Sequence, residues 1–182
     1  RLDLVRGEQR SDRGPHRLLA QAPQREMGVG EAAEADAHGQ LAPAGALGIG
    51  MGPAYTPGAS RDELLRVFEL AARHKALAFI HMRSAGELEP GGSIDGLQEV
   101  LANVAATGAA VHIVHIGSMG LRHTPRLLAM IDGARARGLD VTTEVYPYTA
   151  ASTYLQSALF EPGWQERFAV GFGDNLGRMV EK

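Results

Sequence analysis

The sequence predicts an α/β fold in which parallel strands alternate with helices, and three observations support this prediction. From residue 45 onward, short apolar runs of strand length alternate with longer segments of helical periodicity. Successive apolar runs begin at residues 45, 76, 109 and 140, a spacing that fits one strand–helix unit each. Ionisable residues gather where these runs end. The pattern fits units of a (β/α) barrel and also fits an open doubly wound sheet.

Composition limits the function classes. The 182 residues are 45% hydrophobic and 21% charged, as is usual for one soluble globular domain. A net charge of −3 without a basic segment argues against nucleic-acid binding, and no apolar run approaches the roughly 20 residues that cross a bilayer. No signal peptide is recognisable at the N-terminus, so we expect a cytoplasmic protein. Because cysteine is absent, a metal in this chain would be held by His and carboxylate ligands.

Residues 1–44 differ in composition from the rest of the chain. They are rich in Arg, Gly, Ala, Gln and Glu, with few large apolar residues and no clear period. We expect this segment to be disordered or irregular, and residues 45–182 to form the folded part. Two origins are open for the segment: a natural variable extension, or translation of a GC-rich gene in the wrong frame.

The first two predicted strands enclose a helix. "GALGIGMG" (45–52) is a short apolar run that ends in glycines and leads into the loop "PAYTPGAS". A helix is predicted from Ser60, because Ser60 and Glu63 match a capping box and apolar residues follow at helical spacing. "ALAFIHM" (76–82) is a buried strand by length and composition.

Two further helices follow. Ser93 is expected to cap the second helix, which Gly108 ends. Thr124 and Pro125 are predicted to be the N-cap and first turn of the third helix. The apolar runs between and after these helices are predicted strands: 109–116 and 140–148.

Polar side chains lie at the carboxyl ends of three predicted strands, where parallel α/β proteins place their sites. His81 ends the second strand, His115 the third, and Glu144 with Tyr146 the fourth. Strand alternation is expected to place three groups of side chains on single faces: Phe79 with His81 and Arg83, Ile113 with His115, and Glu144 with Tyr146. These groups are therefore predicted to converge on one cavity.

The histidines at the strand ends can be interpreted as metal ligands or as structural residues of the core. His81 and His115 are metal ligands at equivalent strand ends or hydrogen-bonded core residues, and the pattern leaves both open. His112 has the opposite parity to His115, so we expect it to face a helix in a structural role. His74 and His123 are expected in solvated loops.

Arg83 follows the strand that carries His81. We expect a contact with a substrate carboxylate, and a surface charge is the alternative. No phosphate-binding loop is predicted, because "GALGIGMG" lacks the G-x-G-x-x-G spacing that opens directly into a helix. A G-x-S-x-G nucleophile elbow is also absent from the sequence.

Four stretches together resemble the D-aminoacylase (N-acyl-D-amino-acid deacylase) branch of the amidohydrolase superfamily. They read "GALGIGMGPAYTPGAS", "IHMRSAG", "HIVHIGSMG" and "EVYPYTAAST", and the resemblance covers residues 45–174. It implies a (β/α)8 barrel whose zinc centre activates water to deacylate N-acyl-D-amino acids, which are small-molecule substrates. On this basis the chain is expected to be a partial barrel, with about four parallel βα units of the roughly 250 residues that a whole barrel needs.

The resemblance also implies roles for individual residues. His81 and His115 match the strand-end histidines that hold one tightly bound zinc. Tyr146 matches the tyrosine that helps to polarise the scissile carbonyl or to bind substrate, and is the expected catalytic residue. Ser152 matches a contact for the substrate carboxylate, and Tyr55 an aromatic residue that lines the substrate pocket.

The sequence departs from the family pattern in several places. Ile116 and Gly117 stand where the family has a lysine, and Glu144 replaces an aspartate. The H-x-H motif and bridging cysteine would precede residue 45, and the aspartate that serves as general base would follow Lys182. Two zinc ligands remain where a catalytic site needs three and a water. The sheet edges of a partial barrel would also be open, so self-association is expected.

Two alternative functions remain. One is a truncated chain that has no turnover. The other is an amidohydrolase that acts on a cyclic amide, as hydantoinases and dihydroorotases do. Those enzymes usually carry a carbamylated lysine between two metals, and Lys75 precedes its strand here instead of ending one.

Overall fold

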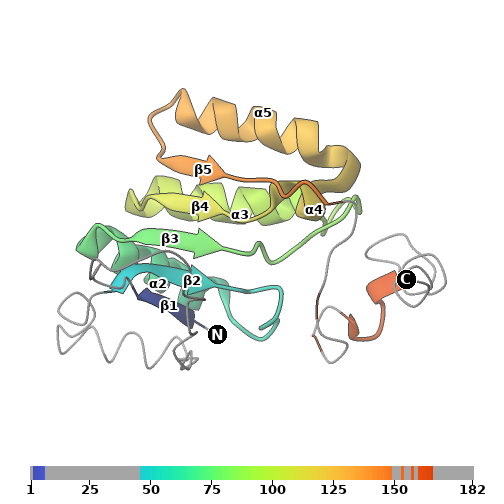
Figure 1. Ribbon diagram of the computed structural model, residues 1–182, viewed down its shortest axis with the longest axis horizontal. Coiled ribbons are helices and arrows are strands. Elements are labelled where there is room, and N and C mark those ends of the chain that lie inside the picture. Colours follow the sequence, from blue (N-terminus) through green and yellow to red (C-terminus); the bar gives the residue numbers. More distant parts are fainter. Residues whose placement is uncertain (1, 7–45, 149–152, 154–156, 158–159, 166–182) are drawn as a thin grey trace, which may run out of the picture.

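The computed structural model describes residues 2–6, 46–148, 153, 157 and 160–165 (Figure 1). It contains one five-stranded sheet in the order β1-β2-β3-β4-β5, with helices packed on one face. The strands are β1 (Leu2–Arg6), β2 (Ala46–Met51), β3 (Leu77–Ile80), β4 (Val111–Ile113) and β5 (Val141–Thr143). The helices are α2 (Arg61–His74), α3 (Ser93–Thr107), α4 (Ile116–Gly120), the 3₁₀ turn η1 (Leu121–His123) and α5 (Thr124–Arg135).

Strands β2 to β5 are parallel, each to its neighbour, which confirms the predicted α/β fold. A helix follows each of β2, β3 and β4 and returns the chain for the next parallel strand. Strand β1 is antiparallel to β2 and was not predicted within residues 1–44. The expected irregular character of residues 7–44 lies outside the described part of the chain.

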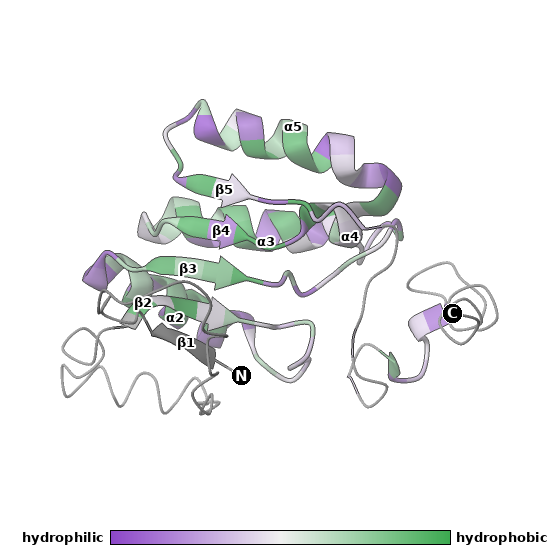
Figure 2. Cartoon of the chain, in the orientation of Figure 1, coloured by the Kyte–Doolittle hydropathy of each residue, from purple (hydrophilic) through white to green (hydrophobic). Residues whose placement is uncertain are grey.

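The core lies between the sheet and its helices. On β3 and just beyond it, Ala78, Ile80 and Met82 are fully buried, and Val111 and Ile113 of β4 continue the same layer. The helices contribute apolar residues, which are coloured green on the ribbon of Figure 2. The largest fully buried ones are Phe68, Leu97, Ile116 and Leu127. Each such side chain stabilises the fold by about 1.5–3 kcal/mol on burial.

Two of the predicted helix ends are confirmed. The Ser60 hydroxyl accepts from the Glu63 N–H at 3.0 Å, and the Glu63 carboxylate accepts from the Ser60 N–H at 2.6 Å. These two bonds form the expected capping box of α2. Gly108 ends α3 in the left-handed conformation with φ 71°, which a residue without Cβ adopts at little cost.

The predicted caps of α3 and α5 were wrong by one residue. Gly92 is the N-cap of α3, and a Cβ there would lie 2.1 Å from the Leu88 carbonyl oxygen, so a serine would not fit. Ser93 is instead the first helical residue and is fully buried. Thr124 has helical backbone angles because α5 continues from η1, and its hydroxyl donates to the Leu121 carbonyl at 2.7 Å. At the junction of η1 and α5, therefore, no residue has the extended backbone that is typical of an N-cap.

Within the described residues, no helix is long and apolar enough to cross a membrane.

Replacement of Ser60 by alanine should destabilise the chain by about 1 kcal/mol, because one N–H in the first turn of α2 loses its acceptor. The free energy of unfolding, measured by urea denaturation of the 182-residue chain, tests this. Glu69→Ala, an exposed change in the same helix, is the control and should have no comparable effect. Equal stability of Ser60→Ala and wild type would contradict the role of the capping box.

Candidate metal centre

His81 and His115 lie together at the carboxyl edge of the sheet. His81 follows β3 directly, and His115 is the second residue after β4, the neighbouring parallel strand. Their ring centroids are 4.8 Å apart with the ring planes at 72°. The structure therefore brings the two predicted metal ligands within range of one small ion.

The route by which His115 reaches this position differs from the prediction. Ile113 was expected to share a face with His115, but Ile113 is fully buried in the core. Strand β4 ends at Ile113, and His115 has the left-handed angles φ 37° and ψ 55°. Strand alternation therefore does not extend to His115. A non-glycine residue in this conformation costs about 1–2 kcal/mol, which the surrounding contacts must offset.

The prediction for His112 was also wrong. It was expected to face a helix, yet it lies half-buried on the opposite face of the sheet from the helices, with its ring 5.6 Å from that of Phe79. Because Val111 and Ile113 are the buried residues of β4, alternation places His112 on the other face. There it contacts Thr142 and Glu144, a network that inspection of the sequence missed. The shared parity of Thr142 and Glu144 was the available signal.

Hydrogen bonds define the tautomer of both candidate ligands. The Nδ1 atom of His81 lies 3.1 Å from the Met82 carbonyl oxygen, which only accepts, so Nδ1 carries the proton. The Nδ1 atom of His115 lies 2.8 Å from the Ser118 hydroxyl, and that hydroxyl donates to the His115 carbonyl at 3.0 Å. We assign the proton to Nδ1 in both rings. Both Nε2 atoms then present a lone pair, as metal-binding imidazoles do.

The charge state of His81 agrees with this assignment. Burial lowers the pKa of His81 below its ordinary value of 6.5, and a charged His115 would lower it further. The hydrogen bond to the Met82 carbonyl acts in the opposite direction but is outweighed. His81 is therefore neutral at pH 7, the form that binds metal.

Two tyrosines complete the group. The Tyr55 hydroxyl, on the loop after β2, lies 3.2 Å from Nε2 of His81 and donates to it. The Tyr146 ring, beyond β5, has its centroid 6.0 Å from that of His115. The structure thus gathers Tyr55, His81, His115 and Tyr146, which come from the four segments that follow β2, β3, β4 and β5.

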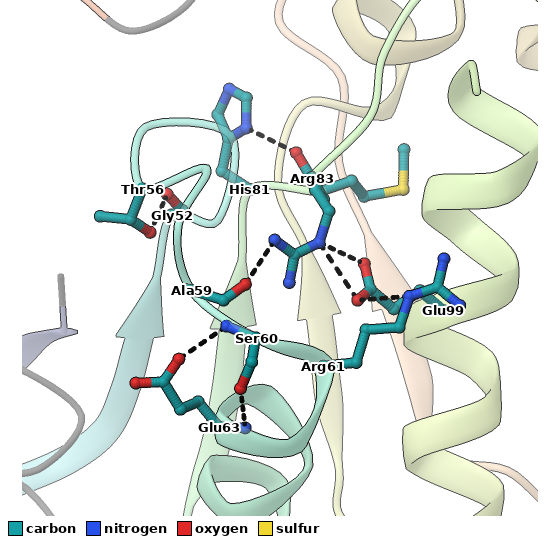
Figure 3. Close-up of polar contacts among 10 residues, drawn as sticks. Gly52, Thr56, Ala59, Ser60, Arg61, Glu63, His81, Arg83 and Glu99 are labelled. Atoms are coloured by element: carbon teal, nitrogen blue, oxygen red, sulfur yellow. Dashed lines mark hydrogen bonds and ion pairs between the residues drawn. The ribbon is translucent and has the colours of Figure 1, made fainter.

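Arg83 and Ser152 are not part of this group. The Arg83 Nε donates to both carboxylate oxygens of Glu99, at 3.0 and 3.2 Å, and an Nη donates to the Ala59 carbonyl at 2.8 Å. In Figure 3 its guanidinium points toward Glu99 on α3, away from the His81 ring. A substrate contact for Arg83 remains a prediction. Ser152 lies outside the described residues.

The donor set fits part of a zinc site. Neutral imidazole nitrogens are preferred zinc ligands, and a catalytic zinc needs three protein ligands and a water. His81 and His115 would supply two of them. Across the described part of the chain, no group of three or more His, Asp or Glu side chains is arranged to hold a metal ion. A third ligand is therefore not provided by the residues that the structure describes.

Comparison with known proteins confirms the resemblance. The chain is 38% identical over 117 residues to an N-acyl-D-glutamate deacylase, and 32% identical over 117 residues to a D-aminoacylase, both from Alcaligenes xylosoxydans xylosoxydans. Each match covers 62% of this chain and 23% of the relative. The chain thus spans about a quarter of the length of these curated relatives. No family model matches it.

Solved structures agree. The N-acyl-D-glutamate deacylase from Bordetella bronchiseptica, determined with zinc and a phosphonate mimic of the tetrahedral intermediate, matches with TM-score 0.51 and 32% identity over 64% of this chain and 26% of its own. A D-aminoacylase described as defining a novel subset of amidohydrolases matches with TM-score 0.55 and 27% identity, over 73% of this chain and 28% of its own. The predicted α/β class with parallel strands is therefore confirmed, and the solved structures that it resembles are D-aminoacylase-type amidohydrolases.

In the metal-free folded chain, His81 should titrate below pH 6.5. The unfolded chain then binds this proton more readily, so His81 contributes stability above about pH 6.5 that is lost as the pH falls toward its folded pKa. An NMR titration of the imidazole resonances in the presence of chelator measures the value. A pKa at or above 6.5 would show that burial does not control this group.

Replacement of Glu99 by glutamine should cost about 3 kcal/mol, because it leaves the Arg83 guanidinium, with its side chain 20% exposed, without its counter-charge. Chemical denaturation measures the loss. Glu87→Gln removes a similar bond to Arg122, whose side chain is 88% exposed, and should cost less. Equal losses in both variants would show that burial of the Arg83–Glu99 pair has no effect.

Proposed function

We propose that this chain is the central part of a zinc-dependent hydrolase of linear amide bonds that deacylates N-acyl-D-amino acids. The observation that supports this most is the pair of facing imidazoles at the carboxyl edge of a parallel sheet. Their Nδ1 atoms are held by protein acceptors, and their Nε2 atoms present lone pairs, of which that of His81 accepts from the Tyr55 hydroxyl. The relatives named N-acyl-D-glutamate deacylase and D-aminoacylase support the same class.

The proposed chemistry assigns a task to each nearby side chain. Zinc held by His81 and His115, together with ligands from outside the described residues, would lower the pKa of a bound water to about 7 and polarise the carbonyl. Tyr146 would donate a hydrogen bond to the oxygen that becomes negative in the transition state, an interaction typically worth a few kcal/mol. Tyr55 would line the pocket beside His81 and release its bond to Nε2 when the ligand binds.

The substrate carboxylate would be bound by Ser152 and Arg83 in this proposal. For Arg83 the available donor is Nη2, which is buried and has no hydrogen-bond partner among the described residues, because Glu99 and Ala59 occupy Nε and Nη1. The position of the family's lysine offers no cation: Ile116 is fully buried, and a Cβ on Gly117 would meet Val145 at 3.5 Å. We therefore propose an N-acyl amino acid as substrate class without naming its side chain.

The second candidate is a chain without turnover. It is favoured by one observation, namely that the described residues offer two zinc ligands instead of three. A cyclic-amide hydrolase is less well supported, because Lys75 is the C-cap of α2 and is exposed. Self-association would be expected for either function if the outer edge of β5 stays unpaired.

Removal of either imidazole should abolish zinc-dependent deacylation. In an active preparation that contains this chain, His81→Ala and His115→Ala should each lose turnover of N-acetyl-D-amino acids and bind zinc at least tenfold more weakly. Calorimetry measures binding, and release of the free amino acid measures turnover. His74→Ala, at the end of α2, is the matched control and should retain both. Full activity and full metal content in His81→Ala would overturn the proposal.

The 182-residue chain with added zinc decides between the two candidates. No turnover from this chain alone, with turnover restored by the remaining barrel segments, supports a hydrolase of which this is a part. No turnover even in the presence of those segments supports the non-enzymatic alternative.

A further inference from the structure

We propose that Glu144 and His112 are positioning residues that hold His115 in the geometry of a metal ligand. This inference rests on the proposed function, because it assigns His115 the task of binding zinc. It concerns side chains that the resemblance leaves without a role.

Glu144 binds two successive N–H groups of the chain at His115. Its carboxylate Oε1 accepts from the His115 N–H at 2.6 Å, and its own carbonyl accepts from the Ile116 N–H at 3.0 Å. The regular pairing of β4 with β5 ends at Ile113 and Thr143. The two bonds from Glu144 therefore hold the segments after these strands together. Both N–H groups flank the residue with φ 37°. Glu144 thus supplies the contacts that offset an unfavourable backbone conformation.

His112 in turn orients Glu144. Oε2 of Glu144 only accepts, so Nε2 of His112 carries the proton, and Nδ1 of the same ring accepts from the Thr142 hydroxyl at 2.8 Å. The Nε2 atom of His112 lies 2.5 Å from Oε2 of Glu144, the carboxylate oxygen that His115 does not use. Both ring nitrogens of His112 are therefore engaged, which makes it unsuitable as a metal ligand and suitable as a support.

The backbone of His115 controls where its imidazole lies. Ser118 binds both the carbonyl and Nδ1 of His115, so ring and backbone are linked in one turn. If the Glu144 carboxylate is removed, the N–H of His115 loses its acceptor and the residue can return to negative φ. The ring would then move away from His81. Two ligands that are no longer preorganised bind a metal more weakly, typically by 10- to 100-fold.

Zinc affinity and NMR of the full 182-residue chain test this inference together. Glu144→Ala should weaken zinc binding at least tenfold, close to the effect of His115→Ala, and should shift the His115 amide proton upfield in the metal-free protein as its charge-assisted bond is lost. Glu144→Gln should retain part of both the zinc affinity and the amide shift, because its amide oxygen still accepts from the His115 N–H. Its amide nitrogen can donate to Nε2 of His112 once that ring takes the other tautomer. His112→Ala should weaken zinc binding less than Glu144→Ala does, but measurably. Glu69→Ala is the control for removal of a carboxylate and should change neither.

The outcomes separate this inference from the proposed function. Wild-type zinc affinity with an unchanged His115 amide resonance in Glu144→Ala would overturn the positioning role. If Glu144→Ala does not fold, the same comparison is made with Glu144→Gln and His112→Ala. If His81→Ala binds zinc like the wild type, the proposed metal site fails, and the His115 amide shift in the metal-free variants then decides the positioning role alone.

Discussion

The parallel pairing of β3 with β4 is the constraint on which the rest of the site depends. Phe79 pairs with His112 and Ile80 with Ile113. The register is secured by burial, since Ile80 and Ile113 are fully buried in the core. A slip of one strand by one residue would turn its buried side chains toward the opposite face. Because the two strands end level with each other, the residues that follow them meet at one edge. The histidines are neighbours for this reason, although they are far apart in the chain.

Much of the fold could be predicted from hydrophobic periodicity and from the residues that begin and end helices. The alternation of apolar runs with helical segments, the capping box at Ser60 and the glycine end of α3 all depend on neighbouring residues, which a sequence displays directly. The exact caps of α3 and α5 could not be predicted. They depend on tertiary context: a close approach of Gly92 to the Leu88 carbonyl, and the continuation of η1 into α5.

The location of the candidate site at the strand ends could be predicted, but the conformation of its residues could not. Strand ends indicated His81, His115 and Tyr146, and the structure brings these three together. The left-handed turn at His115 could not be predicted, since its stabilising partner, Glu144, comes from the next strand. The same holds for Arg83, whose partner Glu99 lies on a helix. Pairs of this kind are decided by packing between elements, and a single sequence contains no direct sign of them.

Strand β1 has a consequence for how this sheet can grow. A strand edge carries a single row of N–H and C=O groups, and on one side of β2 that row is paired with Leu2–Arg6, antiparallel. In a (β/α)8 barrel every edge is shared with another strand. A barrel strand that comes to this edge must therefore compete with β1 for the same groups. Closure at β2 would be an exchange of one strand for another, and its rate would be governed by how readily residues 2–6 detach.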